Sequence, residues 1–238
     1  MQGLIDIHCH VLPGVDDGPE TLEAAVALVR GLRDLGFERL VATPHVRPPR
    51  WDQDLERLGP IRDELVDAVG EGCPRIDIAA ENFFDDVVWR RFKSGELIRY
   101  PGGEAALVEI GSGVEDVPVG FDRRLFEMSV NGVRPVLAHP ERQLALANDR
   151  EALERLFRGG TVPVISITSL AGFFGGPLKR RAESILRWAH PIAAATDAHS
   201  AEELSVAARG IKRLRKLRGD EGVEELMSTT PRSILGEA

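Results

Sequence analysis

The chain has 238 residues, with 38 acidic and 30 basic side chains and a formal net charge of −8 at pH 7. Its hydrophobic content of 43% is too high for a disordered chain and is sufficient for one large core. The acidic balance argues against nucleic acid as the main partner, because phosphate backbones attract basic surfaces. These properties indicate a globular protein that does not bind nucleic acid.

The sequence also argues against insertion into a membrane. No apolar run reaches the ~18 residues that a membrane-spanning helix needs. The first residues lack the basic and apolar segments of a secretory signal. The two cysteines, Cys9 and Cys73, lie far apart and do not form a disulfide scaffold. We therefore expect a cytoplasmic protein.

Short apolar runs alternate with amphipathic segments along the whole chain. Runs of four to six apolar residues, typical of strands buried on both faces, occupy residues 4–7, 39–43, 76–80, 106–110, 135–138, 162–167 and 192–196. Helical periodicity is present at residues 22–32, which end near Gly36, and at 55–69, 123–130, 149–157, 178–188 and from 201 onward. The alternation predicts one parallel α/β domain over residues 1–238, and it fits both a closed barrel and an open doubly wound sheet.

Histidines and carboxylates follow six of the seven predicted strands. These candidate site residues are His8, His10, the pair Asp16 and Asp17, His45, Glu81, Glu109, His139, Asp197 and His199. In a parallel barrel the carboxyl ends of the strands share one face, and that face holds the active site. We therefore expect these side chains to lie close together.

The types of these residues indicate a metal centre. Side chains alternate along an extended segment, so His8 and His10 project to one side while Cys9 points away. An isolated pair of this kind is a weak signal, but its recurrence at equivalent strand ends predicts metal binding. Imidazole and carboxylate ligands without thiolates suit Zn²⁺, Mn²⁺ or Fe. Because the candidate ligands exceed what one ion needs, we expect two or three divalent ions, an arrangement suited to phosphoryl transfer.

Further polar residues near the strand ends have alternative interpretations. Arg142 could hold a phosphate, or it could pair with a neighbouring carboxylate such as Glu141. Of Asp16 and Asp17, one is expected to bind metal and the other to cap the following helix. Cys9 lacks the arginine six residues later that a cysteine phosphatase needs, and we expect it to pack in the core.

Four segments carry a resemblance to a known family. They are residues 5–19 (IDIHCHVLPGVDDGP), 42–45 (ATPH), 138–142 (AHPER) and 196–199 (TDAH). With them the chain resembles the PHP (polymerase and histidinol phosphatase) superfamily. Within it, the chain is similar to the bacterial manganese-dependent tyrosine-protein phosphatases of capsular and exopolysaccharide synthesis. The resemblance spans nearly the whole sequence.

The resemblance implies a distorted seven-stranded (β/α) barrel, similar to a TIM barrel, that holds three metal ions. With the ligand count above, we expect two or three divalent ions, and Mn²⁺ is the first candidate. It assigns the metal ligands as His8, His10, Asp17, His45, Glu81, Glu109, His139, Asp197 and His199, and so selects Asp17 over Asp16. It also implies that Arg142 contacts phosphate. With Arg142, His139 and Glu109 are expected to be catalytic.

We therefore expect a metal-dependent phosphoester hydrolase in which a metal-bridging hydroxide attacks phosphorus. The expected substrate is a phosphotyrosine protein such as a bacterial tyrosine kinase, in the regulation of capsular or exopolysaccharide synthesis. The alternatives are a small-molecule phosphomonoesterase of the histidinol-phosphate type and a non-catalytic module that binds phosphoproteins. A metal-dependent amidohydrolase is disfavoured, because no lysine follows a predicted strand.

The sequence departs from this family around the expected phosphate site. Leu204 stands where the family often has an arginine five residues after the last metal histidine. The usual Gly-His-Phe-Gly is Gly172-Phe173-Phe174-Gly175, which we interpret as a loop over the mouth of the barrel, and Asn82 follows the third-strand glutamate. The metal ligands are thus retained, while the residues that recognise phosphate are partly altered.

Overall fold

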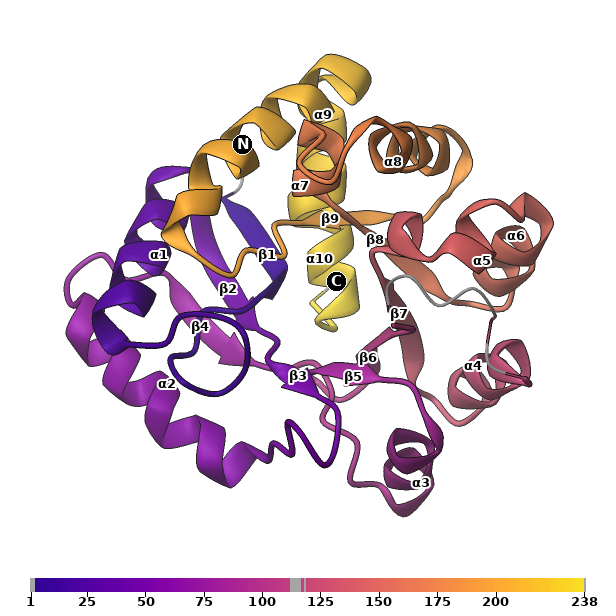
Figure 1. The fold of residues 1–238 in the computed structure, drawn as a ribbon, viewed down its shortest axis with the longest axis horizontal. Helices are drawn as coiled ribbons and strands as arrows, with labels where there is room; N and C mark the ends of the chain where they lie inside the picture. The colour runs from indigo at the N-terminus through magenta and orange to yellow at the C-terminus, as the bar shows by residue number, and fades with distance from the viewer. Residues whose placement is uncertain (1–2, 112–116, 118, 238) are drawn as a thin grey trace.

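The computed structural model describes residues 3–111, 117 and 119–237, so residues 1–2, 112–116, 118 and 238 of the predicted domain lie outside it (Figure 1). In this part of the chain the strands are β1 (Leu4–Cys9), β2 (Phe37–Ala42), β3 (His45–Val46), β4 (Arg75–Ile78), β5 (Glu81–Phe83), β6 (Ala105–Glu109), β7 (Arg134–Ala138), β8 (Val162–Ser166) and β9 (Ala193–Ala195). Each predicted strand therefore has a counterpart.

Helices separate most of the strands and surround them in Figure 1. They are α1 (Leu22–Asp34), α2 (Leu55–Val69), α3 (Asp86–Ser94), α4 (Phe121–Val130), α5 (Leu144–Ala147), α6 (Arg150–Arg158), α7 (Ile167–Ala171), α8 (Gly176–Trp188), α9 (Leu204–Glu224) and α10 (Thr230–Ile234). There are also two 3-10 helices and one π-helical segment: η1 (Pro140–Arg142), η2 (Ala201–Glu203) and η3 (Glu225–Thr229). No helix in the described part of the chain is long and apolar enough to cross a membrane.

The strands form two parallel sheets. One has the order β1-β2-β4 and the other the order β3-β5-β6-β7-β8-β9, and every pairing is parallel. The parallel α/β prediction is confirmed, but among the described residues the strands do not form the single closed sheet of a seven-stranded barrel. The chain passes from the first sheet to the second at Thr43-Pro44, between β2 and β3, and at Ala79-Ala80, between β4 and β5.

Backbone hydrogen bonds nevertheless connect the edges of the two sheets. On one side the amide of Ala79 donates to the Ala42 carbonyl (2.8 Å) and the amide of Glu81 donates to the Pro44 carbonyl (3.1 Å), so the ladder between β2 and β4 continues into the ladder between β3 and β5. On the other, the amide of His10 donates to the Ala198 carbonyl (2.9 Å), and the amide of Asp197 donates to the His8 carbonyl (2.8 Å). These bonds hold the carboxyl end of β1 beside the segment that follows β9.

Apolar side chains fill the space inside the strands as well as the space under the helices. The inner group includes Ile7, Leu107 and Val136 from the strands, together with Ile234 and Leu235 at the C-terminal end of the chain. Figure 1 shows α10 near the centre of the ring of strands. Apolar residues occupy this interior, and the predicted site residues lie at the carboxyl ends of the strands.

Candidate metal centre

The carboxyl ends of the strands bring the nine predicted metal ligands together. Three groups of donor atoms form, each with its atoms within 4.8 Å of one another: His10, Asp17, His45 and His199; His8, His10, Glu81 and Asp197; and His45, Glu81 and Glu109. The ninth residue, His139, joins them through its Nε2, which lies 2.8 Å from Glu81 Oε1. His10, His45 and Glu81 each belong to two groups, so the groups adjoin.

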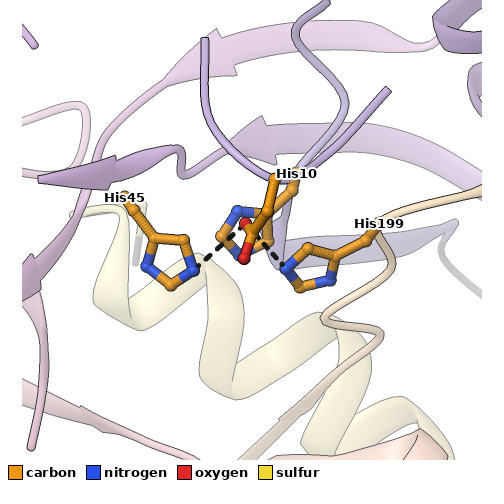
Figure 2. Close-up of side chains that lie close together, drawn as sticks. His10, His45 and His199 are labelled. Carbon is orange, nitrogen blue, oxygen red and sulfur yellow. Dashed lines mark ion pairs between the residues drawn. The ribbon is translucent and has the colours of Figure 1, made fainter. Parts of the chain in front are cut away.

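The outermost group is the most accessible to solvent. Nε2 of His45 lies 3.4 Å from Asp17 Oδ1, and Nε2 of His199 lies 3.5 Å from the same oxygen. Figure 2 shows His10, His45 and His199 converging on one point, and the rings of His10 and His199 are stacked with 4.0 Å between centroids. The neighbouring His199 lowers the pKa of Asp17, so this half-exposed carboxyl group is ionised near neutral pH.

The innermost group surrounds two fully buried carboxylates. Glu81 Oε2 lies 3.2 Å from His8 Nε2, 3.4 Å from His10 Nε2 and 3.1 Å from His45 Nδ1. Burial opposes ionisation of Glu81, but His8 and His45 outweigh it and hold its pKa well below the ordinary value. Burial likewise tends to raise the pKa of Asp197. Arg142 and His8 outweigh this effect and hold the pKa well below its usual range. Both carboxylates are therefore negative at neutral pH.

Several donor atoms in these groups are buried without a hydrogen-bond partner in the described part of the chain. They include His139 Nδ1 and also Glu81 Oε2 and His45 Nδ1, which lie 3.1 Å apart without the geometry of a hydrogen bond. A buried polar atom that makes no hydrogen bond costs about 1–3 kcal/mol, so such atoms point to a missing partner. Because the atoms are imidazole nitrogens and carboxylate oxygens, a divalent cation is the partner that they fit.

Asp16 has a role at this site that the sequence did not predict. Its Oδ2 lies 2.7 Å from His10 Nδ1 and accepts the His45 amide at 3.0 Å. It does not cap α1, because the hydroxyl of Thr21 accepts the Ala24 amide there. Burial raises the pKa of Asp16, but His10 lowers it more, to about 2. Asp16 thus fixes the ring of one candidate ligand and the backbone of another, an arrangement common around protein metal ions.

Two candidate ligands have backbone conformations that residues other than glycine rarely adopt. His139 has a φ of 29° and Asp197 a φ of 54°. Such conformations cost about 1–3 kcal/mol and persist only where the surrounding contacts enforce them. Both residues follow the carboxyl end of a parallel strand, and strained backbone at such positions is typical of a functional site.

Arg142 lies beside the innermost group. Its Nη2 is 2.5 Å from Asp197 Oδ2 and donates to Ser166 Oγ at 3.0 Å. The neighbouring Glu141 instead accepts the Ser166 amide at 3.1 Å, so the carboxylate partner of Arg142 is Asp197. The Arg142 side chain is 13% exposed, which leaves part of it open to a ligand.

Three other residues, Cys9, His190 and Leu204, contribute no atom to the donor groups. Cys9 is fully buried, as predicted, and its thiol donates to the Val41 carbonyl at 3.4 Å. His190 is exposed and lies 3.2 Å from Glu225. The side chain of Leu204 packs on α1: a Cβ added at Gly31 would lie 2.0 Å from Leu204 Cδ1. Leu204 therefore serves helix packing.

Comparisons with known proteins agree with this geometry. The sequence model of the family described as "Capsular polysaccharide synthesis, CpsB/CapC" matches residues 4–236. Tyrosine-protein phosphatase CpsB of Streptococcus pneumoniae is 25% identical over 98% of this chain and 98% of its own length. Tyrosine-protein phosphatase YwqE of Bacillus subtilis is 26% identical over 74% of this chain and 69% of its own.

A solved structure from the same group of phosphatases has a similar fold. It comes from a study of YwqE from Bacillus subtilis and CpsB from Streptococcus pneumoniae, which its authors call unique metal-dependent tyrosine phosphatases. It superimposes on this fold with a TM-score of 0.88 and 25% identity, and it covers 98% of this chain and 95% of the solved chain.

Proposed function

Because the chain belongs to the CpsB/CapC family of capsular polysaccharide synthesis, we propose that it is a metal-dependent protein-tyrosine phosphatase. The convergence of His and carboxylate donor atoms beside one arginine carries this proposal. Adjoining divalent ions with a guanidinium at their edge suit the transfer of a phosphoryl group to water.

The nine candidate ligands divide between the three donor groups. His10, Asp17, His45 and His199 would hold the outer ion, and the two groups that share Glu81 would hold the others, with Mn²⁺ the expected metal. Divalent ions bound there would supply a water of lowered pKa and offset the charge of the phosphoryl group. His139 would complete the set through its contact with Glu81.

The residues of the chain itself bind and orient the substrate. The Arg142 guanidinium would donate to the non-bridging phosphate oxygens, and Ser166 holds it in place. Asp16 would keep His10 and His45 oriented toward the ions. Hydrolysis adds water at phosphorus and breaks the bond to the tyrosine oxygen, which leaves with a proton because phenols have a pKa near 10.

The test is phosphate release from a phosphotyrosine peptide by manganese-loaded protein, with a chelator-treated sample as control. We expect turnover that the chelator abolishes. His139→Ala and Glu109→Ala should abolish it too while retaining the wild-type circular dichroism spectrum. Normal turnover by either variant at full metal content would refute the assignment of that residue.

The same assay distinguishes the two alternatives. A small-molecule phosphomonoesterase would hydrolyse histidinol phosphate or a simple sugar phosphate faster than the phosphotyrosine peptide. A non-catalytic module would retain the phosphopeptide at full metal content without releasing phosphate. Either result would contradict a protein-tyrosine phosphatase.

The proposal extends to the cellular partner and to the fold. A phosphotyrosine protein, such as a bacterial tyrosine kinase of capsule synthesis, would be the substrate, encountered in the cytoplasm.

For the fold, we count β2 with β3 as one barrel strand and β4 with β5 as another, which gives seven strands in one domain. The backbone bonds at Ala79 and His10 support this count. An experimental structure without those bonds would argue against the barrel.

A further inference from the structure

Two neighbouring phenylalanines beside Arg142 are exposed to solvent. Phe173 is 52% exposed and Phe174 is 43% exposed. They belong to the turn Gly172-Phe173-Phe174-Gly175, which follows α7. Covering an exposed aromatic ring with a ligand is energetically favourable, because it removes apolar surface from water. Two exposed rings in succession therefore need an explanation.

The turn that carries these rings is well defined. Gly172 and Gly175 have φ values of +84° and +93°, which favour glycine. The Phe173 amide donates to the Thr168 carbonyl at 3.1 Å, and the Gly175 amide donates to the Gly172 carbonyl at 3.0 Å. The backbone of α7 thus determines where both rings lie.

The same segment also positions Arg142. The guanidinium donates to Ser166 and Thr168 from one side, at 3.0 and 3.4 Å, while its Cζ lies 4.2 Å from the centroid of the Phe174 ring. Phe173 meets Phe174 edge-on, with 5.0 Å between centroids and 81° between planes. The succession from Asp197 through Arg142 and Phe174 to Phe173 therefore leads outward from the donor groups.

Other aromatic rings near the site already have cationic or imidazole neighbours. Trp51 stacks with His45 at 5.0 Å, and the Arg50 guanidinium lies 4.0 Å from its centroid. Among the described residues Phe173 has no such neighbour, and it is more exposed than Phe174. Phe173, which reaches the donor groups through Phe174 and Arg142, is thus free to receive another ring.

On the basis of the proposed function, we propose that Phe173 and Phe174 form the platform that selects aryl over alkyl phosphates. When phosphate oxygens contact Arg142, the group esterified to that phosphate extends outward over the two rings. A phenyl ring can pack edge-on or offset against Phe173, as aromatic pairs prefer, whereas an alkyl group lacks this interaction. Phe174 supports Arg142 and Phe173 contacts the substrate.

The test uses ligands that cannot be hydrolysed. Dissociation constants of phenylphosphonate and butylphosphonate are measured by calorimetry on manganese-loaded protein. We expect wild type to prefer the phenyl compound and Phe173→Ala to reduce this preference about fivefold to tenfold, since an aromatic pair contributes about 1 kcal/mol. Phe173→Tyr, which keeps the ring, should retain it.

Phe126→Ala is the matched control, because Phe126 is 56% exposed but lies on α4, beside Arg155 and Leu156. It should leave the preference unchanged. Equal binding of the two phosphonates by wild type, or an unchanged ratio in Phe173→Ala, would overturn the proposal. Binding does not depend on turnover, so absence of phosphatase activity would contradict the proposed function and leave this ratio interpretable.

Discussion

At the scale of single residues, the site is organised by buried carboxylates that have different tasks. Glu81 and Asp197 face several donor nitrogens, whereas Asp16 contacts only the far side of the His10 ring and the backbone beyond it. Its other oxygen accepts the Gly18 amide at 3.0 Å. Only glycine fits at position 18, because a Cβ there would lie 2.6 Å from the His10 carbonyl oxygen.

Asp16→Asn tests this orienting role. The amide keeps the shape of the side chain but removes the negative charge that holds the His10 ring. We expect the affinity for Mn²⁺, and with it kcat/KM, to fall about 10–100-fold, as is usual when such a partner is lost. Isothermal titration of the metal-free protein measures the affinity. Asp34→Asn, at an exposed carboxylate beside Arg33, is the control, and an Asp16→Asn affinity equal to that of the control would refute the role.

Arg142→Lys tests whether a planar guanidinium is required. Lysine keeps the positive charge near Asp197, but its donors all lie on one nitrogen, so it lacks the planar fork that contacts Asp197 and Ser166 and can also bind a phosphate with two donors. We expect kcat for the phosphotyrosine peptide to fall about 100-fold, the usual loss for one donor to a developing charge. Arg150→Lys, at a surface pair with Glu154, provides the comparison. Equal rates in both variants would show that charge alone suffices.

The sequence could predict most of the site at this scale because residue type and position agreed. Histidines and carboxylates that follow parallel strands lie at the edge where the carboxyl ends of the strands meet, and the structure brings all nine together. The task of Asp16 could not be predicted, because two adjacent aspartates look alike in sequence. The partner of Arg142 depends on β9, more than fifty residues away in the chain.

At the scale of elements, close packing between helices places the segments that line the site. The helix α9 crosses α7 at Gly210, where an added Cβ would lie 2.1 Å from the Ile167 carbonyl oxygen. Backbone groups cannot move aside as the end of a side chain can. Gly210 therefore sets the distance between α9 and the segment that carries Phe173.

Gly210→Ala should destabilise the fold despite the better helix propensity of alanine. Overpacking of this kind costs about 1–3 kcal/mol, and we expect a lower midpoint of thermal unfolding in circular dichroism. Gly31→Ala is the comparison, because its added Cβ meets the end of the Leu204 side chain, which can rotate. A Gly210→Ala midpoint at or above that of Gly31→Ala would contradict the packing argument.

Helices with strong periodicity were predictable, whereas the short helix α7 was not. The predicted helical segments at 123–130 and 149–157 correspond to α4 and α6. The start of α7 could not be predicted, because Ile167 continues the apolar run of β8. The sequence pattern therefore predicts a strand that includes Ile167, the first residue of the helix. The packing of Leu204 on α1 is likewise a contact between distant segments, which no local pattern reports.

At the scale of the whole molecule, an apolar core fills the interior of the strands, and the donor groups lie at their carboxyl ends. The inner core holds Ile5 and Val162 near the beginnings of their strands, with Ile234 and Leu235 packed among them. Tyr100 donates its buried hydroxyl to the Ile7 carbonyl at 2.8 Å within the same region. The parallel α/β class followed from alternation alone, whereas the covering of this core by the C-terminal α10 depends on long-range contacts.

Removal of metal should therefore weaken the whole fold as well as its activity. The buried carboxylates Glu81 and Asp197 lie within one cluster of a chain with net charge −8, and bound cations would offset their repulsion. A ligand at 100 times its dissociation constant stabilises the folded state by about 2.7 kcal/mol, and in a chain of this size each kcal/mol shifts the midpoint by roughly 2–4 °C. We expect chelation to lower the midpoint of thermal unfolding, measured by differential scanning calorimetry, by about 5–10 °C. Excess Mn²⁺ should restore the midpoint. An identical midpoint with and without chelator, at verified metal loss, would show that the donor groups fold without cations and would contradict the metal centre as a structural element.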